Sequence, residues 1–221
     1  MSKNPEHGFW NNPKVVKEFY NAEASPYWRD FLCGLKEPFS YRALDLGCGG
    51  GRNTELLVKK GFDTWACDFY ELMLKATRRR IGILMGASEA RKRIIKASML
   101  NLPFENGCFD IVIANGIYHN TNSIDEFTRA VKETSRILKK GGFLCLNVFY
   151  RGIIAPELKE IKSSKHTFIT PGGLHLTLIG KREVLRILTD FNIMPQGKIA
   201  VYKREVSTGV RSVLRGVFRK S

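Results

Sequence analysis

Residues 43–52 read Ala43-Leu44-Asp45-Leu46-Gly47-Cys48-Gly49-Gly50-Gly51-Arg52, and this stretch decides how the 221-residue chain folds. A short apolar strand is interrupted by an acidic residue and then breaks into a glycine-rich turn that opens a helix. Glycine allows positive φ and a close approach to a ligand, because it has no Cβ. The spacing fits the dinucleotide fingerprint G-x-G-x-x-G only in part, since Arg52 stands where the third glycine belongs. Asp45 would repel a pyrophosphate, whereas it would attract a cationic amine and a sulfonium.

Strand-like and helix-like segments alternate outward from this stretch. Ser123 and Glu126 form a capping box before a helix that we expect to end at Gly141-Gly142. Such alternation predicts a parallel sheet with helices on both faces. The further expected strands are 62–67, 94–97, 109–115 and 143–149, with closing strands at 199–202 and 213–218, and the other expected helices are 54–61, 72–80 and 180–190.

The two ends of the chain differ from this alternating centre. Pro13 and Pro26 each precede apolar residues at helical spacing, so we expect residues 1–40 to form a helical N-terminal lid. Residues 151–179 contain Pro171-Gly172-Gly173 and are expected to be an irregular insertion on the substrate side. A hydrophobic content of 43% over 221 residues suits one core, so residues 1–221 are predicted to form a single domain.

The chain is basic, with a formal net charge of +15. Such a balance can attract nucleic acid, but we favour the simpler explanation that the charges lie on solvated helix faces of an ordinary basic enzyme. We find no aromatic-interleaved basic motif. The basic residues gather at Arg78-Arg79-Arg80, at Arg91-Lys92-Arg93, and at Lys203, Arg204, Arg211, Arg215, Arg219 and Lys220.

The five cysteines are odd in number and show no C-x-x-C spacing. This pattern favours buried thiols in a reducing compartment over a disulfide or zinc framework. No run of about 18 apolar residues is present, and the first seven residues lack the apolar core of an export signal. We therefore expect a cytoplasmic protein without a membrane partner.

The run at 43–52 resembles motif I of the class I S-adenosylmethionine-dependent methyltransferases, and the resemblance covers roughly residues 41–150. It implies a Rossmann-like three-layer α/β sandwich, with a seven-stranded, mostly parallel sheet whose last strand is antiparallel. It also implies S-adenosyl-L-methionine as cofactor and an enzyme that transfers its methyl group. The residues expected to hold the methionine end of this cofactor are Asp45, Gly47, Gly49 and Gly51, and Cys48 of the same turn is a further expected cofactor contact.

The resemblance assigns further cofactor contacts. Asp68 ends the second strand and is expected to accept hydrogen bonds from both ribose hydroxyls. Phe69 would then pack against the adenine. Many relatives carry an Asp where this chain has Ser98, whose hydroxyl would bond the adenine amino group less strongly. Met99 would cover the adenine ring and offer its backbone N–H. Asn115, at the carboxyl end of the fourth strand, is expected to contact the methionine moiety.

The acceptor side is less defined. Methyl transfer mainly needs alignment, and a base only where the acceptor must lose a proton. Tyr118 and His119 follow Asn115 and are candidate catalytic residues, with His119 as the base if one is used. Further candidate substrate residues are His175 and an aromatic group of Tyr20, Tyr27 and Trp28, for which ordinary helix packing is an equal explanation. No metal site is expected.

Three functions remain open from the sequence. The first is methylation of an O, N or S atom of a small-molecule acceptor. The second is methylation of tRNA or another RNA, with the basic residues holding phosphates. The third is a non-catalytic nucleotide-binding protein on the same fold. Nothing in the sequence identifies the acceptor or the oligomeric state.

Overall fold

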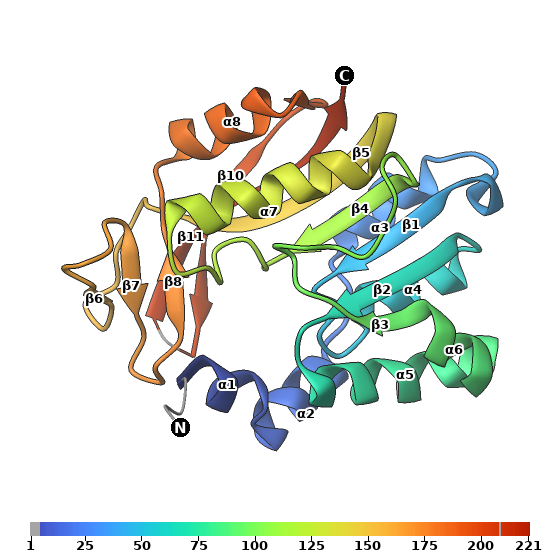
Figure 1. Cartoon of the computed structure of the whole chain (residues 1–221), viewed down its shortest axis with the longest axis horizontal. Coiled ribbons are helices and arrows are strands. Elements are labelled where there is room, and N and C mark those ends of the chain that lie inside the picture. The colour runs from blue at the N-terminus through green and yellow to red at the C-terminus, as the bar shows by residue number, and fades with distance from the viewer. Residues whose placement is uncertain (1–4, 208) are drawn as a thin grey trace.

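The computed structural model describes residues 5–207 and 209–221 and shows a mixed sheet between two layers of helices (Figure 1). The main path of the sheet runs β3-β2-β1-β4-β5-β11-β10. Strands β1 to β5 are parallel, and β11 is antiparallel to both of its neighbours β5 and β10. The expected seven-stranded sheet is thus confirmed, and a short further strand, β9, pairs with the end of β11.

The strand bounds follow the expected alternation closely in the first half of the chain. The strands of the main sheet are β1 Arg42–Leu46, β2 Asp63–Asp68, β3 Ile94–Lys96, β4 Phe109–Asn115, β5 Leu138–Tyr150, β9 Ile193–Pro195, β10 Ala200–Val206 and β11 Gly209–Lys220. The helices are α1 Pro5–Trp10, α2 Pro13–Asn21, α3 Pro26–Cys33, α4 Arg52–Lys59, α5 Glu71–Met85, α6 Ala87–Arg93, α7 Ile124–Ile137 and α8 Lys181–Asp190, with a 3₁₀ turn at Pro38–Ser40.

Side chains of the central strands alternate between two apolar clusters. Leu44 and Val112 belong to the cluster that α7 and α8 cover. Ala43 and Ile111 point the other way, into the cluster that α3 and α4 cover. Since successive residues of a strand face opposite sides, both faces of β1 and β4 are buried. This explains why these strands are almost continuously apolar.

Helix α7 begins as predicted but ends earlier. The Ser123 hydroxyl accepts a hydrogen bond from the Glu126 N–H at 3.1 Å, so the cap is present. The helix ends at Ile137, and Gly141-Gly142 lie inside β5, contrary to the prediction. The β4–β5 register shifts here, and a Cβ on Gly142 would lie 2.9 Å from the carbonyl oxygen of Lys139. Gly141 and Gly142 therefore lie in an irregular part of β5 and do not end the helix.

Residues 151–179 are not irregular throughout, as was expected. They contain a three-stranded antiparallel sheet formed by β6 Lys159–Glu160, β7 Thr167–Ile169 and β8 His175–Thr177. Phe168 and Leu176 of this sheet are buried in a cluster against which Phe9 and Trp10 of α1 pack. The strands are too short to show an alternating pattern in the sequence, and the α1 residues that pack on them lie far away along the chain.

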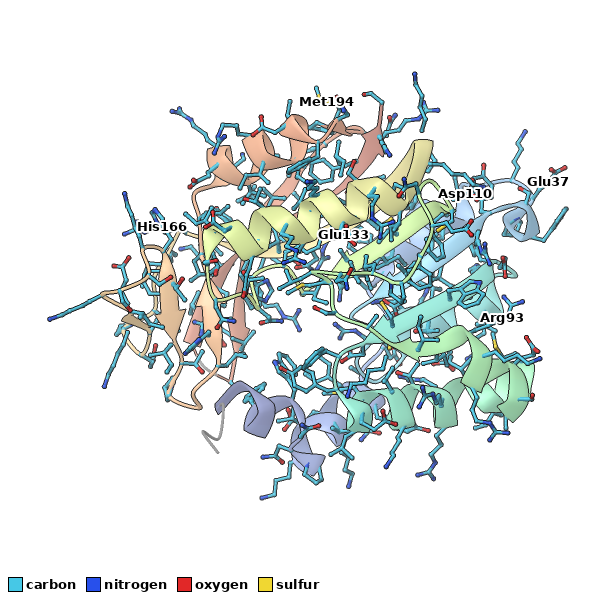
Figure 2. The ribbon with its side chains drawn as sticks, in the orientation of Figure 1. Glu37, Arg93, Asp110, Glu133, His166 and Met194 are labelled. Atoms are coloured by element: carbon cyan, nitrogen blue, oxygen red, sulfur yellow. The ribbon has the colours of Figure 1, made fainter. Side chains whose placement is uncertain are left out.

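Three further features are the state of the cysteines, the length of the helices and the placement of charged side chains. All five cysteines are free thiols, and three are buried. No helix among the described residues is both long and apolar enough to cross a bilayer. Figure 2 labels two half-buried charged side chains, Arg93 at the end of α6 and Glu133 on α7. Arg93 forms an ion pair with Asp63 at the start of β2, and Glu133 forms one with Arg136 at 2.9 Å.

Candidate functional site

The glycine turn after β1 is held against the end of β2. The N–H groups of Gly47 and Cys48 both donate to the Cys67 carbonyl, at 2.9 and 3.0 Å. Gly47 has a φ of 71° and Gly49 a φ of 53°, values that a residue with a Cβ adopts only with strain. The turn therefore needs glycine at these two positions, which is what the sequence pattern predicted.

Asp68 at the end of β2 joins the turn to α5. One carboxylate oxygen accepts from the Gly49 N–H at 2.9 Å, and the other accepts from the Tyr70 N–H at 3.0 Å. The side chain is buried, and this burial raises its pKa above the usual value for an aspartate. Each carboxylate oxygen retains a second lone pair for a further donor, so Asp68 can still bind a ligand hydroxyl.

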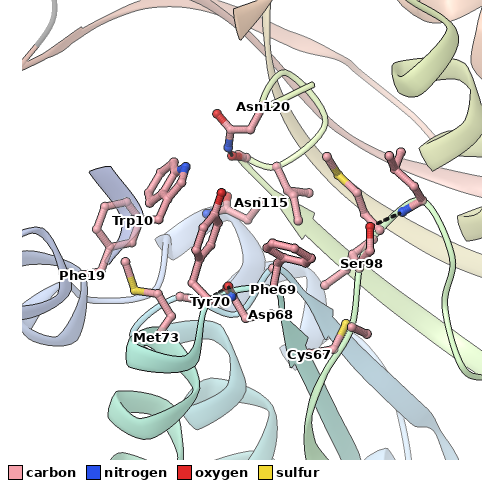
Figure 3. A pocket seen from close by; sticks show the side chains of 18 of the residues that line it. Trp10, Phe19, Cys67, Asp68, Phe69, Tyr70, Met73, Ser98, Asn115 and Asn120 are labelled. Carbon is pink, nitrogen blue, oxygen red and sulfur yellow. Dashed lines mark hydrogen bonds between the residues drawn. The ribbon is translucent and has the colours of Figure 1, made fainter. Parts of the chain in front are cut away.

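A first cavity of about 290 Å³ opens beside Asp68 (Figure 3). In Figure 3 the rings of Phe69 and Tyr70 lie close to Asp68, and Trp10 and Phe19 stand opposite them. Seven residues predicted to bind the cofactor line this cavity, namely Gly47, Gly49, Asp68, Phe69, Ser98, Met99 and Asn115. The Ser98 hydroxyl accepts a hydrogen bond from the Leu100 N–H at 3.2 Å.

Three predicted cofactor residues, Asp45, Cys48 and Gly51, do not line this cavity. Asp45 is fully buried, and one oxygen accepts from the Thr54 hydroxyl at 2.6 Å, which ties β1 to α4. Burial raises the pKa of Asp45 to about 6, partly offset by the bond from Thr54. Its other oxygen makes no hydrogen bond with any described residue. Asp45 thus acts from beneath the turn rather than on the cavity wall.

A second cavity of about 350 Å³ adjoins the first. Asn115 and Gly116 at the end of β4 line both cavities, as do Trp10 and Phe19 of the N-terminal helices. These shared residues form the boundary between the two spaces. The second cavity is further lined by Phe9, Arg52, His119, Asn147, Phe149, Arg204 and Arg211, among others.

His119 reaches the second cavity, but its ring is not arranged as a base. Its Nδ1 accepts from the Phe149 N–H at 3.0 Å, so the ring proton resides on Nε2. The ring is 3% exposed and stacks on Phe149 at 4.0 Å between centroids. Burial, together with the charge of Arg211, lowers the pKa of His119 to about 3. The predicted general base is therefore a neutral hydrogen-bond donor.

Tyr118 does not reach either cavity, contrary to the prediction. It is fully buried against α7, and its hydroxyl donates to the Thr134 hydroxyl at 2.6 Å. Burial raises the pKa of the Tyr118 phenol well above its usual value. Adjacent residues after a strand point in different directions, and only His119 of this pair faces the open space.

The predicted aromatic lid of Tyr20, Tyr27 and Trp28 lines neither cavity. Trp28 is fully buried, and its indole N–H donates to the Asn115 side chain at 3.1 Å, so it positions a cavity residue from below. Tyr27 packs edge-on against Trp28, and Tyr20 lies beneath the Arg80 guanidinium. The N-terminal aromatics that do line the cavities are instead Phe9, Trp10 and Phe19.

His175 also lies off the cavity walls. Its Nδ1 is 2.7 Å from the Asn122 side-chain oxygen, while its neighbours Leu174 and Leu176 line the second cavity. Asn147 and Phe149 line the second cavity but were not predicted from the sequence. Both stand at the carboxyl end of β5, beside the end of β4, which is a position where α/β sheets place ligands. Their position at the end of a strand could have identified them from the sequence. No local sequence pattern indicates that Trp10 lines the cavities.

We expect His119 to remain neutral from about pH 5 to 8, because its folded-state pKa lies far below the ordinary value of about 6.5. Nitrogen-15 NMR should show one protonated ring nitrogen that does not titrate over this range. The His119→Asn variant identifies the signal by its loss. A ring that titrates near its ordinary pKa would restore the general-base role.

Comparison with known proteins finds a similar domain family and similar sequences. Residues 44–146 match the methyltransferase domain family. A probable tRNA methyltransferase 9B of Mus musculus is 29% identical over 171 residues, which make up 77% of this chain and 34% of that protein. A demethylmenaquinone methyltransferase of Thermobifida fusca is 32% identical over 124 residues, 56% of this chain and 50% of that protein. The chain thus spans about a third to a half of these relatives.

Solved structures share the fold. A SAM-dependent methyltransferase of Methanosarcina mazei matches with a TM-score of 0.70 at 19% identity, over 90% of this chain and 99% of that one. The 1,6-didemethyltoxoflavin-N1-methyltransferase of Burkholderia thailandensis, solved with that molecule and S-adenosylhomocysteine, matches with a TM-score of 0.66 at 16% identity. That match covers 100% of this chain and 92% of the other.

Proposed function

We propose that the chain is a class I S-adenosylmethionine-dependent methyltransferase and that it transfers a methyl group to an acceptor held in the second cavity. The observation that carries this proposal is the pair of adjoining cavities, which meet at Asn115 and Gly116. A donor in the first cavity and an acceptor in the second would face each other across these residues. Such alignment is the main requirement of a methyl transfer.

The residues of the first cavity fit the cofactor. Asp68 offers carboxylate oxygens for ribose hydroxyls, and the free oxygen of buried Asp45 adds negative charge beneath the turn. Gly47 has a φ of 71°, and a Cβ there would also crowd the end of the Ile117 side chain at 2.2 Å, so the turn favours glycine. When bound, S-adenosylmethionine supplies a methyl group activated by a sulfonium. We assign Phe69, Ser98 and Met99 to the adenine, with Asn115 toward the methionine end.

The chain's own residues would then orient the acceptor and exclude water. Trp10 and Phe19 shield the boundary between the cavities from the side of the N-terminal helices, and this is our proposal for residues 1–40 as a lid. His119 presents an Nε2–H and no free lone pair. An acceptor that keeps no proton on its reacting atom at neutral pH suits such a site, because no proton must be removed.

The acceptor is first proposed to be a small molecule, methylated on O, N or S, because the second cavity is only about 350 Å³. RNA is a second candidate that two observations favour. The net charge is +15, and the mouse relative that matches 77% of the chain is a probable tRNA methyltransferase. The five free cysteines support the proposed cytoplasmic location.

The test is formation of S-adenosylhomocysteine, measured by mass spectrometry with small-molecule extracts in one arm and bulk tRNA in the other. We expect product in at least one arm, and much less with the Asp68→Ala variant as control when the cofactor is limiting. If tRNA is the acceptor, its binding should weaken steeply as salt rises above about 50 mM. No product in either arm, from protein that binds S-adenosylhomocysteine, would leave only the non-catalytic function.

A further inference from the structure

Two arginines line the second cavity without a protein partner. Arg52, at the start of α4, and Arg204, on β10, make no side-chain hydrogen bond or ion pair with any described residue. The Arg52 guanidinium lies 5.9 Å from the centre of the Phe19 ring. Other arginines nearby are engaged, since Arg80 pairs with Glu55 at 2.8 Å.

The like charges around Arg52 raise the cost of leaving it without an anion. Its pKa is lowered by burial first and then by the charge of Arg204, with smaller effects from Arg80 and Arg215, and the charge of buried Asp45 offsets only part of this lowering. Two carboxylates, Glu18 and Glu205, also line this cavity, but neither forms an ion pair with Arg52 or Arg204 in the described structure. A bound anion would relieve this repulsion.

Two neutral polar side chains, Asn147 and His119, line the buried part of the second cavity. Asn147 is 4% exposed, and its side chain makes no hydrogen bond with any described residue although it lines the cavity. His119 lies beside it and offers an Nε2–H. Phe149 and Phe19 provide aromatic surface on the same walls. The cavity thus combines cations, hydrogen-bonding groups and flat apolar faces.

We propose that the acceptor is a planar molecule or moiety that carries an anionic group, a carboxylate or a phosphate, bound by Arg52 and Arg204. Asn147 and His119 orient its inner end beside Asn115 and Gly116, and the aromatic rings hold its faces. A guanidinium suits both anions, because its planar donors bind two oxygens at once. This inference rests on the proposed function, since it specifies the acceptor of that same site.

The test measures binding to protein saturated with S-adenosylhomocysteine, so that nucleotides are kept from the first cavity. The probes form matched pairs, uridine 5′-monophosphate against uridine and 4-hydroxybenzoate against 4-hydroxybenzamide. Trp10 at the cavity boundary provides a fluorescence signal, and calorimetry provides a second readout. We expect the anionic member of at least one pair to bind about tenfold more tightly than the neutral member.

Charge-removing variants locate the effect. Arg52→Gln and Arg204→Gln should each reduce the preference for the anion by about tenfold. Lys203→Gln is the matched control, because it removes the same charge from the neighbouring residue of β10, which does not line the cavity. Unchanged affinity of each variant for S-adenosylhomocysteine would show that the first cavity is intact.

Equal binding within both pairs would overturn the proposal, as would a preference that neither variant reduces or that Lys203→Gln reduces equally. Bulk tRNA distinguishes the two sources of the anion. Binding of tRNA that uridine 5′-monophosphate displaces and Arg204→Gln weakens would place the anion on RNA. Without that behaviour, an anion preference indicates a free small molecule. A failure of the methyl-transfer assay is separate, because these binding measurements need no turnover.

Discussion

Replacing Gly50 with alanine is expected to displace α2 and lower cofactor affinity by about tenfold or more. A Cβ at this position would lie 2.4 Å from the backbone carbonyl carbon and oxygen of Phe19 and from the backbone nitrogen of Tyr20. Backbone atoms cannot rotate away as a flexible side chain can, so the helix itself must move. Phe19 lines both cavities and would move with it. Overpacking of this kind costs about 1–3 kcal/mol of unfolding free energy.

Calorimetric titration with S-adenosylhomocysteine and urea denaturation measure the two effects. The control is Gly180→Ala at the start of α8, where a Cβ would meet no atom within 4 Å and φ is −63°. This variant should bind the cofactor product normally. If Gly50→Ala matches the control in both measurements, the close packing of α2 on the glycine turn is refuted.

Replacing Asp68 with alanine should weaken binding of S-adenosylhomocysteine by about 2–4 kcal/mol, through the loss of two charge-assisted hydrogen bonds to the ribose. The structure adds a second cause. The carboxylate also accepts from the Gly49 and Tyr70 N–H groups, so its removal leaves the turn without support. Asp68→Asn retains one acceptor oxygen and should show a smaller loss.

Asp63→Ala is the matched control, because Asp63 begins the same strand and forms surface ion pairs with Arg42 and Arg93. Its removal should leave cofactor binding unchanged. Calorimetry on folded Asp68→Ala protein that gives wild-type affinity would disprove the ribose assignment. Near-equal losses for Asp68→Ala and Asp63→Ala would point to general destabilisation of β2.

Local patterns predicted the sheet and the glycine turn well. Gly47 and Gly49 adopt positive φ, and Asp68 lies against the turn about twenty residues later, as the spacing implied. These features depend on neighbours in the sequence or on the adjacent parallel strand. The short strands of residues 151–179 escaped prediction, because each has only two or three residues and is stabilised by contacts with distant segments.

For the residues predicted to face the acceptor, residue type alone gave the wrong roles. Tyr118 and His119 are neighbours in the sequence. The Tyr118 hydroxyl is hydrogen-bonded in the core, whereas the His119 ring lines the second cavity. A histidine in this position suggested a base. Its actual tautomer follows from the Phe149 N–H, thirty residues away on β5, which no local pattern contains.

The stretch 43–52 by itself determined the strand, the glycine turn and the helix start, and it predicted the methyl donor, because these features are properties of neighbouring residues. Only the tertiary structure decided which side chains line the second cavity, where we propose that the acceptor binds. Phe19, Arg52, Asn147 and Arg204 come from α2, α4, β5 and β10, and packing alone brings them to one cavity. Folding also buried Asp45 beneath the turn, where desolvation rather than ligand contact governs its charge.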